Sequence, residues 1–172
     1  MKQGLIFPAL FVVASSVALP TSAKADDAED FFRFFSWFQA SWKGEVEESG
    51  KKQTVSGKCS DSGGRCNIYV GTGETSVWGY DPREKMWTGV GHLENGSRFL
   101  RKCHKPKTGK EIKAGVKISM TGTTWHTDGT IEYETTTFTC LDANTGRWHT
   151  KRKDQDGKAL PPITMIAKKV KP

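Results

Sequence analysis

The chain contains four cysteines, and their number and spacing allow either two disulfides or a metal site. Structural zinc sites usually place about two to four residues between neighbouring cysteines. Six residues lie between Cys59 and Cys66, so the spacing favours disulfides. We predict one bridge between Cys59 and Cys66, a second between Cys103 and Cys140, and no metal ion.

Aromatic and aliphatic residues recur at every second position in several short runs, which is typical of strands with one buried face. In the run at 130–141, this alternation is interpreted as placing Tyr133 inward and Glu132 and Glu134 on a solvated face. Inward faces of this kind would bind a small apolar or aromatic ligand. The alternative is that the same side chains only pack the core. The predicted ligand-binding residues are Trp78, Tyr80, Ile118, Met120, Tyr133, Trp148 and His92.

Catalytic motifs are absent from the sequence. It contains no Gly-x-Ser-x-Gly, no His-Glu-x-x-His and no phosphate-binding glycine loop. His92 and His126 are expected near the mouth of the fold, and a haem or metal role for either is the alternative hypothesis. Neither has a metal-ligand spacing, so both are interpreted as surface residues and no cofactor is predicted. The sequence favours a binding protein over an enzyme, although an enzyme whose site is assembled from distant strands stays open.

A basic stretch between residues 98 and 117 suggests another function. It contains eight Lys or Arg residues and one acid, Glu111, and it would suit an anionic surface of the cell envelope. A solvated loop is the simpler reading. Phe99 is its only aromatic residue, so the stacking pattern of single-strand nucleic-acid binders is missing and no nucleic acid is predicted. The basic residues are Arg98, Arg101, Lys102, Lys105, Lys107, Lys110, Lys113 and Lys117.

The first 25 residues have the three parts of an export signal. Lys2 is followed by an apolar segment from Leu5 to Leu19, and Ala23-Lys24-Ala25 gives the small residues of a cleavage site. We therefore predict a signal peptide at 1–25 and one domain at 26–172, located in the periplasm or outside the cell. Removing the signal lowers the formal charge from +7 to +5 and leaves no transmembrane segment in the mature chain.

Beyond the signal, the pattern predicts one helix followed by ten strands. Phenylalanines at helical spacing begin at Phe31, and such a face must be buried or lie on a membrane surface. Turn signals such as Asn95-Gly96 and Asp128-Gly129 then separate short strand-like runs. The strands are predicted at 42–48, 52–59, 65–71, 75–81, 86–93, 97–104, 111–122, 130–141, 146–154 and 163–170.

Ten strands joined by short turns predict an all-β, antiparallel up-and-down barrel, because closure removes exposed strand edges. A two-sheet sandwich is the alternative. In such a meander the four cysteines and the N-terminal helix fall at the same end. We expect the helix to plug that end and the mouth to lie at the other end, near Gly50, Gly73, Gly96, Asp128 and Gly157.

Three motifs resemble a family of secreted bacterial lipocalin-like (calycin-like) proteins of unknown function. They are Trp42-Lys43-Gly44, the segment from Gly79-Tyr80-Asp81-Pro82 to Lys85-Met86-Trp87, and the end of the chain from Trp148 through Asp156-Gly157 to Pro161. The first reverses the Gly-x-Trp order of lipocalins. The resemblance implies a barrel with a tryptophan closing its floor, and it implies no particular activity.

Overall fold

The computed structural model describes residues 25–107 and 110–170. The predicted signal peptide lies outside the described residues except for Ala25. Within the described part of the chain, no helix is both long and apolar enough to cross a membrane.

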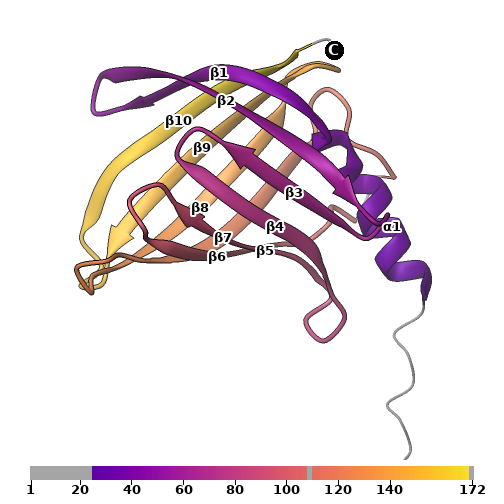
Figure 1. Ribbon diagram of the computed structural model, residues 1–172, viewed down its shortest axis with the longest axis horizontal. Helices are drawn as coiled ribbons and strands as arrows, with labels where there is room; N and C mark the ends of the chain where they lie inside the picture. Colours follow the sequence, from indigo (N-terminus) through magenta and orange to yellow (C-terminus); the bar gives the residue numbers. More distant parts are fainter. Residues whose placement is uncertain (1–24, 108–109, 171–172) are drawn as a thin grey trace, which may run out of the picture.

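Ten antiparallel strands form one closed barrel (Figure 1). Each strand pairs with its neighbours in the chain, and β1 pairs with β10 to close the circle. The predicted meander, its ten strands and its closure are confirmed. The strands are β1 Ala40–Glu48, β2 Lys51–Ser62, β3 Cys66–Gly71, β4 Glu74–Asp81, β5 Met86–Leu93, β6 Arg98–Cys103, β7 Lys117–Trp125, β8 Ile131–Cys140, β9 Thr145–Asp154 and β10 Ala159–Val170.

The largest boundary error concerns β7, which was predicted to begin at 111 but begins at Lys117. Ile112, taken as part of this strand, is buried in the core at the helix end of the barrel. The turn after it has a Val116 N–H to Lys113 carbonyl bond of 3.0 Å, and Gly115 adopts a φ of 87°. Ile112 is therefore a buried loop residue, although its place in the sequence pattern is typical of the start of a strand.

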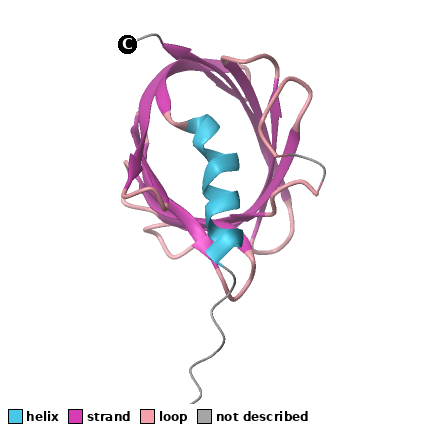
Figure 2. Cartoon of the chain, turned by 90° about the vertical axis from the view of Figure 1, so that its right-hand side faces the viewer, coloured by secondary structure: helices cyan, strands magenta, loops and turns pink. Residues whose placement is uncertain are grey.

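One end of the barrel is closed by helix α1, Ala25–Phe35, and the following turn η1, Ser36–Phe38 (Figure 2). Phe34 and Phe35 on its inner face are 0% and 2% exposed. The ring of Phe35 stacks on Trp87 at 4.9 Å between centroids, and Phe38 packs on Phe138 at 4.9 Å. Burial of this aromatic face stabilises the plug, and the expected position of the helix is confirmed.

The prediction of two disulfides is wrong, since all four cysteines are free in the structure. Cys59 lies opposite Tyr69 and Cys66 opposite Ser62, which offsets the two cysteines by three residues, about 10 Å, along the paired strands. Their side chains also lie on opposite faces, since Cys59 lines the interior while the Cys66 Sγ donates to the Ser62 carbonyl.

The second predicted pair fails for a different reason. Cys103 on β6 and Cys140 on β8 are separated by β7. Two strand spacings amount to about 9.5 Å, and a disulfide requires Cα atoms within about 7 Å. The cysteines do lie at the helix end of the barrel, as expected, but Cys103 and Cys140 are not opposite one another across the paired strands.

Candidate functional site

The barrel encloses a cavity of about 300 Å³ between the aromatic plug and the turns at the other end. All ten strands contribute to its wall, because every second side chain of each strand points inward. A cavity of this size matches the lower range of small-molecule sites. Its lining is Phe35, Phe38, Trp42, Lys43, Gly44, Val46, Val55, Ser56, Gly57, Cys59, Asn67, Tyr69, Glu74, Trp78, Trp87, Arg101, Cys103, Met120, Glu134, Thr136, Trp148, Thr150, Ile163, Met165 and Ala167.

Tryptophan rings form much of the apolar wall. The indole N–H of Trp42 donates to the Phe38 carbonyl at 2.8 Å, and that of Trp78 donates to Ser76 Oγ at 3.0 Å. Trp148 packs edge-on against Trp42 with ring centroids 5.8 Å apart. Because the N–H groups of Trp42 and Trp78 are bonded to the protein, these two rings are held in place and offer the cavity an apolar surface.

Three charged side chains interrupt this wall and form what we call the interior ion cluster: Glu74, Arg101 and Glu134. Arg101 Nη1 donates to Glu74 Oε2 at 2.7 Å, and its Nε donates to Glu134 Oε1. The guanidinium carbon also lies 4.0 Å from the centroid of the Phe99 ring. The three side chains are 20%, 22% and 7% exposed for Arg101, Glu74 and Glu134.

The two carboxylates keep Arg101 charged inside the barrel. Burial alone would lower the pKa of Arg101, but Glu74 and Glu134 raise it above its ordinary value. Glu74 is held in turn by Ser76, whose Oγ donates to Glu74 Oε1 at 3.0 Å. With two carboxylates and one guanidinium, the cluster carries a net charge of −1.

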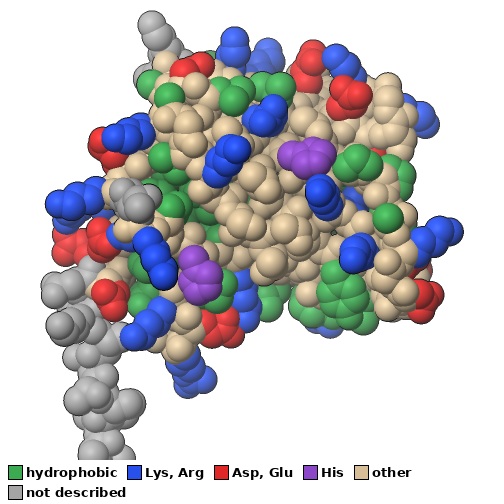
Figure 3. All heavy atoms as spheres, turned by 180° about the vertical axis from the view of Figure 1, so that it is seen from behind, with side chains coloured by type: hydrophobic (Ala, Val, Ile, Leu, Met, Phe, Trp, Pro, Cys, Tyr) green, Lys and Arg blue, Asp and Glu red, His purple; other side chains and the backbone are tan. Residues whose placement is uncertain are grey.

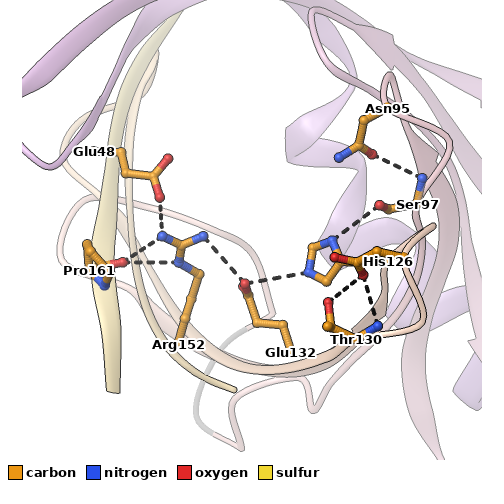
Figure 4. A network of polar contacts seen from close by, with 9 residues as sticks. Glu48, Asn95, Ser97, His126, Thr130, Glu132, Arg152 and Pro161 are labelled. Atoms are coloured by element: carbon orange, nitrogen blue, oxygen red, sulfur yellow. Dashed lines mark hydrogen bonds and ion pairs between the residues drawn. The ribbon is translucent and has the colours of Figure 1, made fainter. Parts of the chain in front are cut away.

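A second polar layer lies nearer the mouth (Figure 4). Arg152 contacts Glu48 and donates to the Pro161 carbonyl, and its Nη1 lies 3.5 Å from Glu132 Oε2. The same Glu132 oxygen lies 3.7 Å from His126 Nε2. Burial raises the pKa of Glu132 from its ordinary value, while Arg152 opposes this shift. These contacts connect β1, β10, β9 and β8, which are consecutive around the barrel, with the turn that follows β7.

The residues predicted to bind a ligand occupy three different places. Trp78, Met120 and Trp148 line the cavity. Tyr80 and Ile118 point inward but belong to the core cluster packed around the helix. Tyr133 and His92 do not point inward, so two of the seven are placed wrongly.

The error at Tyr133 reverses the two faces of β8. Tyr133 is 49% exposed, whereas Glu132 and Glu134 are each only 8% exposed. Phe138, at 0% exposure, fixes the inward face, and counting back from it in twos reaches both glutamates. Arg101 and Arg152 make their burial tolerable by pairing with them.

His92 lies at the mouth end, as expected, but its side chain is exposed on the outer surface. It borders a shallow outer groove together with Val77, Val90 and Leu100. Side chains of β5 alternate between the inside and the outside of the barrel. Because Trp87 is buried inside, the even-numbered residues of β5, including His92, point outward.

The basic stretch does not form a single charged surface. Arg101 points into the barrel, Lys102 pairs with Glu84 at 2.6 Å, and Lys105 pairs with Asp30 of the helix. On the face of the molecule in Figure 3, Lys and Arg side chains are dispersed among acidic and polar ones.

Sequence reasoning missed the interior ion cluster entirely. The sequence pattern assigns Arg101 to the basic stretch and Glu134 to a solvated face, and it gives no signal for Glu74. A signal was present, because the buried Phe99 and Phe138 set the inward parity of β6 and β8. Among the described residues, no group of three or more His, Cys, Asp or Glu side chains is arranged to hold a metal ion.

Comparison with known proteins gives no family. No protein-family description matches the chain, and no curated protein matches it. Several solved structures match, and one of them, described as EF1p2_mFAP2b bound to DFHBI, is 11% identical to this chain. The match covers 81% of this chain and 98% of that one, with a TM-score of 0.41. A likeness at this level carries no argument about what this chain binds.

Proposed function

We propose that this chain is an exported, lipocalin-like carrier that binds a small apolar or aromatic molecule inside its barrel. The observation that carries the proposal is the cavity of about 300 Å³, lined by indole rings and aliphatic side chains. A barrel built only for stability would fill this space with side chains, because cavities cost packing energy. The closed ten-strand barrel with a helical plug is consistent with the calycin-like resemblance of the sequence.

The construction of the barrel supports this role. The helix and its aromatic cluster seal one end, so a ligand would pass between the turns at the other. The fixed tryptophans give the pocket its shape before a ligand arrives, which lowers the entropy cost of binding.

Native mass spectrometry of the protein purified from its own host tests the proposal. A mass excess that disappears on denaturation supports a retained ligand, and its value begins to identify the compound. Binding of naphthalene derivatives by the ligand-free protein, followed by calorimetry, provides a second measurement. Failure of both to show binding would contradict the proposed function.

A matched pair of variants locates the site. Met120 lines the cavity, whereas its neighbour Thr121 points outward from the same strand. Met120→Trp should fill the cavity and weaken binding by about tenfold or more, and Thr121→Trp should leave it within about twofold. Equal effects of the two substitutions would place the binding site elsewhere.

A further inference from the structure

We infer that the cavity selects ligands that carry a positively charged nitrogen on their apolar or aromatic body. This inference rests on the proposed function and adds the charge class of the ligand. It is argued from the charges that face the cavity, from the atoms they leave available and from the rings around them.

The charge facing the cavity is negative although the chain as a whole carries +7. The cavity wall holds Glu74 and Glu134 against Arg101 alone. Lys43 also borders the wall, but it is exposed and lies between the inward positions of Trp42 and Gly44, so its ammonium is on the outer face. The wall therefore presents a net charge of −1.

Another inward cation, Lys169, lies at the helix end of the barrel. Its Nζ is 3.9 Å from the ring centroid of Trp37 and 5.6 Å from that of Trp42. Lys169 is not among the residues that line the cavity. Its position over two indole rings shows that the indole surfaces here accept a cation.

The hydrogen bonds of the interior ion cluster leave a carboxylate oxygen for a ligand. Arg101 directs Nε to one Glu134 oxygen and Nη1 to Glu74. The other Glu74 oxygen accepts from Ser76. Within the described part of the chain, Glu134 Oε2 accepts no hydrogen bond from another side chain, so it can receive an ammonium N–H.

The rings around the cluster favour the same charge. Trp42, Trp78 and Trp148 share the cavity with Glu134, and indole faces attract a desolvated cation. An anion would have to approach Arg101 past the two carboxylates that already neutralise it, and it would be repelled by the net negative charge. A neutral ligand would gain from the rings but not from the carboxylate.

Three naphthalene derivatives of matched shape test the inference by calorimetry at neutral pH: naphthalene-1-methylammonium, naphthalene-1-methanol and naphthalene-1-carboxylate. We expect the ammonium to bind about tenfold tighter than the alcohol, with the carboxylate weakest. Absence of binding by all three would count against the proposed function itself. Equal binding, or tightest binding of the carboxylate or the alcohol, would overturn only the charge preference.

Two variants assign the preference to the cluster. Glu134→Gln keeps an oxygen for Arg101 but removes the charge, so it should weaken ammonium binding about tenfold and leave the alcohol within about twofold. Glu84→Gln, which removes a carboxylate paired with Lys102 on the outside, is the control and should change neither. An ammonium preference that survives in folded Glu134→Gln would overturn the assignment, and if this variant does not fold, the ranking of the three ligands on the unchanged protein decides.

Discussion

Arg101 and Glu134 meet inside the barrel across a strand that has no side chain between them. Arg101 on β6 pairs with Gly122 on β7, and Gly122 pairs with Glu134 on β8. A Cβ at position 122 would lie 2.6 Å from Glu134 Oε1 and 2.9 Å from Arg101 Cγ. The missing side chain therefore allows Arg101 Nε to reach Glu134 Oε1, although the two residues are 33 positions apart. Gly89 makes room in the same row for the ring of Trp78.

Gly122→Ala should separate the Arg101–Glu134 pair. The added methyl group overpacks the row, and we expect a loss of about 1–3 kcal/mol in the free energy of unfolding, measured by urea denaturation. Gly79→Ala is the matched control, since a Cβ there would lie 3.7 Å from its nearest neighbour. Equal stability of the two variants would show that position 122 does not need glycine.

Arg101→Met should be more damaging, because it leaves Glu74 and Glu134 without their shared partner. Removing one member of a buried ionic group costs about 3–5 kcal/mol in unfolding free energy. Urea denaturation of both proteins at neutral pH measures this loss.

A compensated variant separates lost charge from lost packing. Replacing Glu74 and Glu134 by Leu together with Arg101→Met removes the whole interior ion cluster and should recover most of the stability. The preference for the ammonium probe over the alcohol should then be lost. An Arg101→Met protein as stable as the original would contradict the view that Arg101 compensates two buried carboxylates.

The turns explain why the fold could be predicted from sequence. Asn95-Gly96 and Asp128-Gly129 each place a glycine at positive φ, 83° for Gly96 and 88° for Gly129, and each joins two strands where expected. These signals are local, so a single sequence reveals them. Strand number, direction and closure then follow from chain order.

The site depended on information that local signals do not contain. The burial of Phe138 against the plug determines which face of β8 points inward. A shift of one residue places Tyr133 inside and the two glutamates outside, the reverse of the observed arrangement. Arg101 resembles a surface residue until its partners on β4 and β8 are known. Whether Cys59 and Cys66 can form a disulfide depends on the register between β2 and β3. That register does not follow from the fact that both cysteines lie at the same end of the barrel.

Glu132 should make stability depend on pH in a definite direction. Burial raises its native pKa above the ordinary 4.5, so the folded protein holds this proton more tightly than the unfolded chain. The contribution is fully present below pH 4.5 and is lost as pH rises through the raised native pKa. Glu132→Gln, which does not titrate, should therefore gain stability relative to the unchanged protein over this window.

The comparison requires urea-derived unfolding free energies for both proteins at several pH values from about 4 to 7. Glu45→Gln, at a side chain that is 68% exposed, is the control for removing a carboxylate from the surface. A difference for Glu132→Gln that is flat, or that changes in the opposite direction, would show that Arg152 and His126 outweigh burial at this carboxyl.

The cysteines should differ sharply in reactivity. Burial raises the pKa of Cys59 to about 11 and that of Cys103 to about 12, and it also raises the pKa of Cys140. Cys66, partly exposed on the outer face, is the thiol we expect iodoacetamide to modify first in the folded protein at about pH 8. Intact mass should show one rapid adduct, absent in Cys66→Ser, and four adducts after unfolding without reductant, because the structure has four free thiols. An unfolded protein that takes up no reagent would show that disulfides form after all, and rapid modification of Cys103 in the folded state would show that the helix end of the barrel opens.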